Sequence, residues 1–211
     1  HRAAEVDLTG RVARLPEAGE TIGGGSLARA VGGKGASQAA AAASLGAAVR
    51  MIGAVGDDED GRWSLAALQE AGVDVTGVRV VDAPTGIALI GVEASGENQI
   101  MVCPGANAEV ALGSDAFAEG ETVLVQLEVA LDVVMQVAAA SPAFLVGNAA
   151  PALPLPAELI ERTHLFIVNE SEYELMPELQ KAQRVAVTYG ASGAAIFTNG
   201  VETARVPAVP A

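Results

Sequence analysis

The chain has 211 residues, 51% of them hydrophobic, which is enough for one domain with a sizeable core. Its 26 acidic and 12 basic residues give a formal net charge of -14 without a basic stripe, so the composition argues against a nucleic-acid partner. The longest apolar runs, such as Val123 to Leu127, are far shorter than the roughly 20 residues that cross a bilayer, so no membrane span is expected.

The start of the chain and its single cysteine bear on the compartment. The sequence begins at His1 without an initiator methionine or an apolar signal-peptide core, so secretion has no support. Cys103 is the only cysteine and cannot form an internal disulfide, which suits a reducing compartment. We therefore predict a cytoplasmic protein in which Cys103 is a small buried thiol on a strand.

In chain order, strand-like segments at 6–14 and 21–30 come first, followed by residues 36–48, which are nearly all small with strong helix propensity. From Val49 onward, short apolar runs alternate with helical patterns, which is typical of βαβ units and of a mostly parallel, helix-covered sheet. The strands expected there are 50–55, 122–127, 143–146, 164–168 and 185–188, and the helices are 63–71, 131–140 and 156–163.

Two segments interrupt this parallel pattern. Gly86 to Glu93 and Asn98 to Cys103 are strand-like, and the hairpin-length connection between them excludes a parallel crossover. With the first two strands they predict a small antiparallel sheet, formed discontinuously from about residues 6–30 and 85–104, that projects from the α/β body as a lid. Residues 1–211 together are predicted to form one α/β domain.

The segment Gly32-Gly-Lys-Gly35 directly precedes the helix of small residues. Glycine N–H groups and a helix N-terminus would face one point with the Lys34 ammonium beside them, which suits an oxygen-rich ligand. It is not a Walker A loop, because Gly35 stands where serine or threonine is required after the lysine. Taken alone, the segment has a plain turn as its alternative interpretation.

Several further motifs accompany this turn along the chain. They are Pro16–Thr21, Gly32–Ala40, Gly53–Asp58, Thr85–Gly86, Pro104–Asn107, Gln126–Glu128, Asn148–Ala152, Asn169–Glu172 and Thr188–Gly193. In order and spacing they resemble the ribokinase-like (PfkB-type) carbohydrate kinases, and the resemblance covers essentially the whole chain. It implies the ribokinase-like α/β fold, with a central sheet flanked by helices and a β lid.

The resemblance also implies a sugar site when the family's residues are carried over by position. Asp7 would accept hydrogen bonds from sugar hydroxyls, and Glu128 would be a second carboxylate at the other end of the sugar. Gly32 and Gly33 would offer backbone N–H groups, and Lys34 a charged donor. Ordinary exposed carboxylates are the alternative for the two acidic residues.

On the nucleotide side, Asn169 and Glu172 match the family's N-x-x-E element, which organises Mg²⁺ and phosphate. Glu172 would act through water, since Mg²⁺ retains several waters when bound to protein. A plain helix N-cap is the rival interpretation of Asn169. Thr188 and Gly190 resemble the nucleotide-side loop. ATP and Mg²⁺ are the implied cofactors, with K⁺ as a third candidate.

Two positions near the implied sugar site depart from ribokinases proper. Glu5 stands where the family usually has asparagine two residues before the sugar aspartate, and Ser37 replaces another asparagine. Both changes alter the hydrogen bonds on offer, which leaves ribose itself in question as the substrate. A phosphorylated sugar would favour extra cations, and only Lys34, with Arg29 as a candidate addition, is visible there.

The last residues, Val206 to Ala211, stop just before the position where family members present a G-A-G-D element. The resemblance implies that the anion hole and the catalytic aspartate base lie beyond Ala211, so the chain as it stands is expected not to turn over. The segment from Asn169 to Thr188 is also shorter than expected for a parallel crossover, with Pro177 interrupting its helix.

Together these features predict an ATP-dependent sugar kinase whose full form phosphorylates the primary hydroxyl of a pentose or related sugar. The alternatives are a non-catalytic sugar-binding protein that lacks the catalytic element, or a kinase for nucleosides or fructose phosphates. The edge strands of the lid predict a homodimer formed through it.

Overall fold

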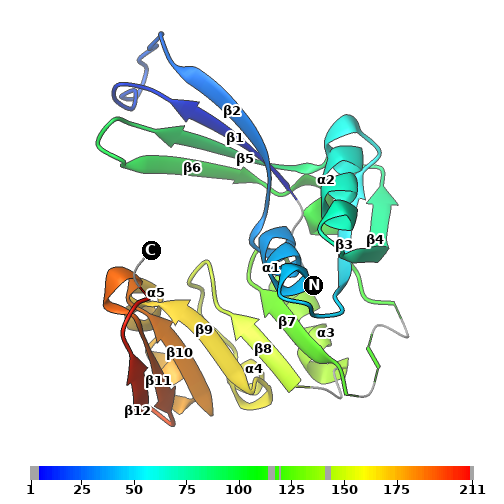
Figure 1. Ribbon diagram of the computed structural model, residues 1–211, viewed down its shortest axis with the longest axis vertical. Helices are drawn as coiled ribbons and strands as arrows, with labels where there is room; N and C mark the ends of the chain where they lie inside the picture. Colours follow the sequence, from blue (N-terminus) through cyan, green and yellow to red (C-terminus); the bar gives the residue numbers. More distant parts are fainter. Residues whose placement is uncertain (1–4, 114–116, 119, 141–143, 210–211) are drawn as a thin grey trace. The chain divides into compact units, whose positions relative to one another are not determined.

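The computed structural model describes residues 5–113, 117–118, 120–140 and 144–209 (Figure 1). The chain divides into two compact units, an N-terminal unit of Arg2–Ala111 and a C-terminal unit of Leu112–Ala211. The N-terminal unit contains two sheets and the C-terminal unit one, and each unit has its own buried side chains, so each is described by itself.

The N-terminal unit contains a four-stranded sheet with the order β2-β1-β5-β6. The stretches expected to build a discontinuous sheet supply these strands: β1 (Glu5–Arg11), β2 (Ser26–Gly32), β5 (Gly86–Val92) and β6 (Asn98–Cys103). The predicted antiparallel arrangement is wrong at one pairing, because β1 and β5 run parallel. A hairpin forces its own two strands to be antiparallel, whereas the long connection between β2 and β5 lets the chain return in the direction of β1.

The rest of the N-terminal unit is a helix followed by a βαβ unit. Small residues allow the first helix to pack closely, and Ala36 and Ala39 are buried with Met51, Val55, Leu68 and Val73 in one cluster. The strand that closes this unit was not predicted, because none of its residues is fully buried, half of them are exposed, and they include Gly77. The elements are α1 (Lys34–Ser44), β3 (Arg50–Gly56), α2 (Glu59–Glu70), β4 (Asp74–Val81) and the 3₁₀ turn η1 (Gly105–Glu109), with β3 and β4 parallel.

The C-terminal unit contains a six-stranded sheet with the order β12-β11-β10-β9-β8-β7. Strands β7 to β10 are parallel neighbours, and β11 and β12 extend the sheet in antiparallel fashion. The strands are β7 (Thr122–Gln126), β8 (Phe144–Asn148), β9 (Leu165–Asn169), β10 (Arg184–Thr188), β11 (Ala194–Thr198) and β12 (Val201–Val206). The helices are α3 (Leu131–Ala140), α4 (Ala157–Arg162), α5 (Glu170–Leu175) and the 3₁₀ turns η2 (Pro177–Lys181) and η3 (Gly190–Ser192).

The short connection between β9 and β10 is nevertheless a complete parallel crossover. Helix α5 spans six residues, and Pro177 begins the 3₁₀ turn η2 instead of breaking a longer helix. Leu179, in η2, is fully buried and anchors the connection. A short helix followed by a 3₁₀ turn is therefore enough to join the two parallel strands.

Two expectations about individual features meet different outcomes. Cys103 ends β6 as predicted for a strand residue, but it is exposed, so the prediction of a buried thiol is wrong. All six residues of β6 are exposed, because this strand lies at the edge of its sheet. No helix in the described parts of the chain is long and apolar enough to cross a membrane.

Candidate functional site

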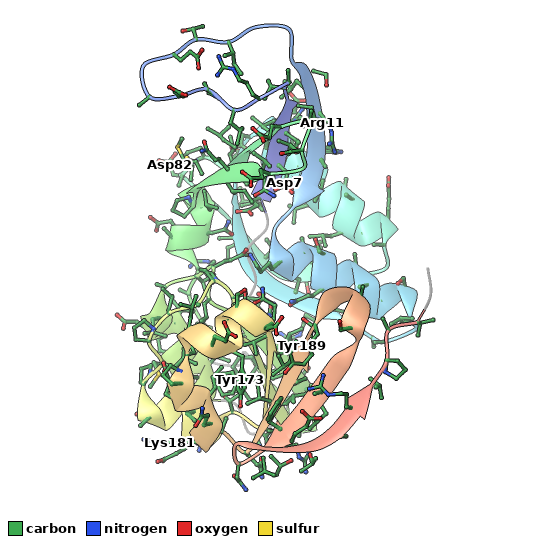
Figure 2. The ribbon with its side chains drawn as sticks, turned by 90° about the vertical axis from the view of Figure 1, so that its left-hand side faces the viewer. Asp7, Arg11, Asp82, Tyr173, Lys181 and Tyr189 are labelled. Atoms are coloured by element: carbon green, nitrogen blue, oxygen red, sulfur yellow. The ribbon has the colours of Figure 1, made fainter. Side chains whose placement is uncertain are left out.

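The Asp7 carboxylate lies directly against Gly32, at the end of β2. The register of β1 places Asp7 opposite Ala30 on β2 and Ala88 on β5, so its neighbours across both strands are small. A Cβ atom added to Gly32 would overlap the Asp7 carboxylate, so no other residue fits there without a shift. Figure 2 shows Asp7 near the end of the sheet at which β2 leads into α1, and Arg11 further along β1.

The turn after Gly32 places a helix N-terminus beside this carboxylate. Gly33 is the N-cap of α1 and has a positive φ of 87°, a conformation that glycine adopts without strain, and no side chain caps the helix. Lys34 and Ser37 are both exposed and lie three residues apart on the first turn of α1, hence on the same side of the helix. The structure therefore brings Asp7, Gly32 and Gly33 together and sets Lys34 next in the chain.

Glu5, the first departure from the ribokinase pattern, lies in the same row as Asp7. Residues two apart on a strand point to the same face, so both carboxylates belong to one face of β1. Glu5 is only 5% exposed, and the residues opposite it on the neighbouring strands are both glycines, Gly32 and Gly86. The amide of Asn107, itself buried, lies against Gly86. A buried polar row thus borders the turn.

Arg29 does not belong to this face. It pairs with Leu8, so its side chain points to the opposite side of the sheet from Asp7. There it forms ion pairs with Glu59 and Asp60 and lies over the ring of Trp63. The interpretation of Arg29 as an additional cation near the sugar is therefore wrong, because the strand register turns it away.

A hydrogen-bonded cluster at the start of α2 was not predicted. Asp58 Oδ1 accepts hydrogen bonds from Gly61 N at 2.7 Å and from Thr85 Oγ1 at 2.6 Å, and Oδ2 accepts one from Thr85 N at 2.7 Å. Gly56 N donates to Thr85 Oγ1 at 2.9 Å. Partial burial alone would raise the pKa of Asp58, but the hydrogen bonds from Thr85 and Gly61 together outweigh it, so this pKa lies below its ordinary value.

In the C-terminal unit, polar residues end four consecutive parallel strands. Gln126 ends β7 and pairs with Asn148 at the end of β8, while Asn169 ends β9 and pairs with Thr188 at the end of β10. Glu128 follows two residues after β7 and is half-buried. In open α/β sheets, ligands bind at the carboxyl ends of parallel strands. The predicted residues Glu128, Asn169 and Thr188 therefore lie along the edge where a ligand is expected.

Asn169 and Glu172 form a complete capping box at the start of α5. Asn169 Oδ1 accepts a hydrogen bond from Glu172 N at 2.8 Å, and Glu172 Oε2 accepts one from Asn169 N at 2.8 Å. The helix N-cap interpretation of Asn169 is confirmed. The same reciprocal bonds hold both side chains at the carboxyl end of β9.

The loop after β10 is built from small residues. Gly190 has a positive φ of 54° and opens the turn η3, and nothing lies within 4 Å of the position a Cβ would take there. Tyr189 N donates to Gly193 O at 2.8 Å, which closes the loop. Its ring, labelled in Figure 2, lies under the guanidinium group of Arg205, 4.8 Å from the ring centroid. The side-chain position of Gly190 thus borders open space, two residues after Thr188.

The described residues contain no group of three or more histidine, cysteine, aspartate or glutamate side chains arranged to hold a metal ion. Of the expected magnesium residues, Asn169 and Glu172 offer oxygen atoms, the ligand type that Mg²⁺ prefers. Two such side chains fit an ion held mainly by phosphate and water, and they do not form a complete protein site.

Comparison with known proteins places the chain in a family. The family model described as pfkB family carbohydrate kinase matches residues 3–211. The chain belongs to the pfkB family of carbohydrate kinases. It is 35% identical to the ribokinase of Haemophilus influenzae over 197 residues, covering 89% of this chain and 64% of that protein. It is 34% identical to the ribokinase of Bacillus subtilis over 225 residues, covering 99% of this chain and 76% of that protein.

Solved structures agree on the fold. The ribokinase of Thermotoga maritima superposes with a TM-score of 0.89 at 23% identity, covering 100% of this chain and 77% of that one. The ribokinase of Arabidopsis thaliana, solved with ribose and ATP, superposes with a TM-score of 0.83 at 27% identity, covering 99% of this chain and 77% of that one. The predicted ribokinase-like α/β fold is confirmed. The pfkB chain described here spans 64% to 77% of the length of these four relatives.

Proposed function

We propose that the full-length protein is an ATP-dependent sugar kinase of the ribokinase type, which transfers the γ-phosphate of ATP to the primary hydroxyl of a pentose or related sugar. One observation carries this proposal: the Asp7 carboxylate lies against Gly32, in the turn that opens α1. A carboxylate accepts hydrogen bonds from hydroxyl groups, and the adjacent backbone and Lys34 supply donors. That combination suits a polyhydroxylated ligand.

In this proposal each sugar-side residue has a distinct task. Asp7 accepts from two sugar hydroxyls, and Gly32 and Gly33 present backbone to the ring because neither has a side chain in the way. Lys34 donates to a ring or hydroxyl oxygen, with Ser37 beside it on the same side of α1. Glu128 is proposed as a second sugar carboxylate. Buried pairings of this kind discriminate strongly, since an analogue lacking a hydroxyl leaves protein groups unsatisfied.

The nucleotide side is proposed to use the carboxyl ends of β9 and β10. Asn169 and Glu172 would orient Mg²⁺-bound water next to the phosphates, and Thr188 with the backbone at Gly190 would contact ATP. When bound, Mg²⁺ neutralises charge on the transferred phosphoryl group. The base that takes the hydroxyl proton is proposed to lie beyond Ala211, and a K⁺ requirement is proposed for the full protein.

An unphosphorylated sugar is favoured over fructose phosphates as the substrate. Arg29, which the sequence offered as an additional cation beside Lys34, points to the other face of the sheet. Glu5 and Asp7 instead place two carboxylates on the face of β1 that borders the turn. Acidic side chains at this place accept hydrogen bonds from hydroxyl groups and offer no cation to a phosphate group. Nucleosides, which are also uncharged, remain the second candidate substrates.

A homodimer is proposed to form through the four-stranded sheet. Edge strand β6 carries Ile100, Met101 and Val102, each more than half exposed, and contains no charged residue. Exposed apolar strands of this kind commonly mark a protein interface. Replacing Ile100 with aspartate is expected to shift sedimentation from dimer to monomer. A monomeric wild-type protein at micromolar concentration would remove this part of the proposal.

The activity test uses the full-length protein with ATP, Mg²⁺ and a panel of D-ribose, 2-deoxyribose, hexoses, nucleosides and fructose 6-phosphate. We expect sugar-dependent ADP formation with an uncharged pentose or nucleoside, and an Asp7→Asn variant with sugar affinity lowered by about 100-fold. Asp82→Asn, a change of an exposed aspartate of the same unit, is the matched control and should behave as wild type. Sugar binding without ADP formation would favour a non-catalytic sugar-binding protein, and no response to any sugar would overturn the proposal.

A further inference from the structure

The side chain of Arg29 ties the edge strand β2 to the first turns of α2. It forms an ion pair with Asp60, a second one with Glu59 at 3.5 Å, and its guanidinium carbon lies 4.7 Å from the centroid of the Trp63 ring. The Glu59 side chain is 85% exposed, whereas that of Asp60 is 24% exposed. The Asp60 pair is therefore the better shielded of the two ion pairs, and the Trp63 residue that Arg29 lies over is 36% exposed.

The part of α2 that receives Arg29 is itself held firmly. Asp58, just before the helix, caps Gly61 N and binds both the backbone and the hydroxyl of Thr85. Thr85 immediately precedes β5, so the start of α2 is fixed to the interior of the four-stranded sheet. Arg29 thus holds the edge of that sheet to a support that is already anchored to its centre.

Strand β2 needs such a support near the sugar-binding turn. It lies at one edge of the sheet, has β1 as its only neighbour there, and exposes five of its seven residues. Arg29 lies three residues before Gly32, which packs against the Asp7 carboxylate. A shift of β2 by even a few tenths of an ångström would change that contact, because no space separates the two groups.

We propose that Arg29 is a positioning residue for the sugar site. Together with Asp60 and Trp63 it holds β2 so that Gly32 and Gly33 stay against Asp7, although Arg29 itself lies on the opposite face of the sheet and does not touch the sugar. The proposal rests on the proposed sugar-binding role of Asp7 and the turn. We call the three residues Arg29, Asp60 and Trp63 the β2 clamp.

The composition of the chain supplies a direct reporter for the β2 clamp. Trp63 is the only tryptophan, so tryptophan emission reports on the surroundings of this one ring. A sugar that orders the turn at Gly32 and Gly33 should tighten the clamp and change the environment of the ring. We therefore expect a change in Trp63 fluorescence on titration with the accepted sugar, and its loss in a variant without the guanidinium group.

The test uses the full-length protein with Arg29→Met, Arg29→Lys and a matched control, Arg62→Met. Arg62 lies on α2, the helix that carries Asp60 and Trp63, and forms an ion pair with Asp57 in which both side chains are largely exposed. For Arg29→Met we expect KM for D-ribose, or for whichever uncharged sugar is accepted, to rise about tenfold with kcat changed less than about twofold. Arg29→Lys should recover part of the loss, because it keeps the charge but not the planar stack. Arg62→Met should match wild type.

Hydrogen exchange of the β2 amides separates the two proposals, because it needs no sugar. Faster exchange over residues 26–32 in Arg29→Met, with no sugar bound by wild type, would support the clamp and count against the proposed function. Wild-type sugar binding with an unchanged KM in Arg29→Met would overturn the positioning role, as would unchanged exchange in β2. If Arg29→Met lacks a cooperative unfolding transition, Asp60→Asn takes its place with the same expected rise in KM and the same outcomes.

Discussion

The two main sheets contain similarly apolar strands but bury them differently. In the C-terminal unit, strands β7 to β10 place alternate or consecutive apolar side chains in the core, and Phe166 is only 2% exposed. In the N-terminal unit, β6 is equally apolar in composition, yet Ile100 is 57% exposed. Apolar composition therefore identifies strands, whereas the place of a strand in its sheet decides whether it stabilises a core or forms a surface. In the sheet that carries Asp7, both edge strands, β2 and β6, are largely exposed.

The strongest test of this difference compares Phe166→Ala with Ile100→Ala. Phe166 packs against Gly147, so closely that a Cβ there would lie 2.9 Å from Phe166 Cε1. Truncating a buried phenylalanine costs about 4 kcal/mol of unfolding free energy, whereas truncating an exposed isoleucine costs less than about 0.5 kcal/mol. Urea unfolding followed by circular dichroism measures both. Equal losses in the monomer would show that the two sheets are not distinguished by burial.

A second prediction concerns the contact between Gly32 and Asp7 in the proposed sugar site. Gly32→Ala should lower sugar affinity by at least about 100-fold, equivalent to about 3 kcal/mol, because the new Cβ displaces the Asp7 carboxylate. The matched control is Gly23→Ala, at a glycine with open space around it and no positive φ. Isothermal titration calorimetry with the accepted sugar gives both affinities. A Gly32→Ala variant that binds normally would mean that Asp7 is not a sugar ligand.

A third prediction follows from the low pKa of Asp58. A carboxylate whose pKa is lower in the folded state stabilises the fold above its ordinary pKa of about 4, and this contribution disappears as the pH falls through the folded-state value. Asp58→Asn should therefore cost about 2 kcal/mol at pH 7 and progressively less below pH 4. Urea unfolding between pH 3 and pH 7 measures this, with Asp57→Asn at the exposed neighbouring aspartate as control. A pH-independent loss would contradict the assignment.

The smallest expected effect is a gain in stability. Ser64, on the buried side of α2, is fully buried, and its Oγ has no hydrogen-bond partner among the described residues. Removing an unpaired buried hydroxyl should stabilise the N-terminal unit by about 1 kcal/mol, so Ser64→Ala should raise its midpoint of thermal unfolding. Ser44→Ala, at an exposed serine at the end of α1, is the comparison and should leave the midpoint unchanged. A destabilised Ser64→Ala variant would mean that the hydroxyl has a partner, such as an ordered water.

The sequence predicts the strands of the parallel sheet because their apolar runs are continuous and bounded by helices. Strands β4 and β12 were not predicted, since they lie at sheet edges and mix exposed polar residues with apolar ones. Strand β11 was not predicted either, although its residues are apolar except for Thr198 and none of them is exposed. The cluster around Asp58 was not predicted from the sequence for another reason. Its main partner, Thr85, is 27 residues away, and the local run of acidic residues looks like a solvated helix start.

The features of the candidate site also divide into those that the local sequence predicts and those that depend on distant residues. The GGKG turn before a helix is visible locally, because glycine and helix propensity are properties of neighbouring residues. The contact between Asp7 and Gly32 depends on the register of β1 against β2 and joins residues 25 positions apart, so it was not predicted. The family resemblance implied only that both residues belong to the sugar site. Register also explains why Arg29 was wrongly expected near the sugar. It precedes Ala30, the partner of Asp7, by one residue, so its side chain lies on the opposite face of the sheet.

The uncharged edge strand β6 also has a consequence for how molecules of this protein behave in concentrated solution. Its six residues, Asn98 to Cys103, offer unpaired backbone groups to any other strand, and no lysine or glutamate blocks the approach. Where β6 is not covered by a partner, as it would be in the proposed homodimer, the long-range repulsion from the net charge of -14 opposes pairing between molecules. Near the isoelectric point of 4.4, or in strong salt, that repulsion vanishes, and turbidity should appear first under those conditions.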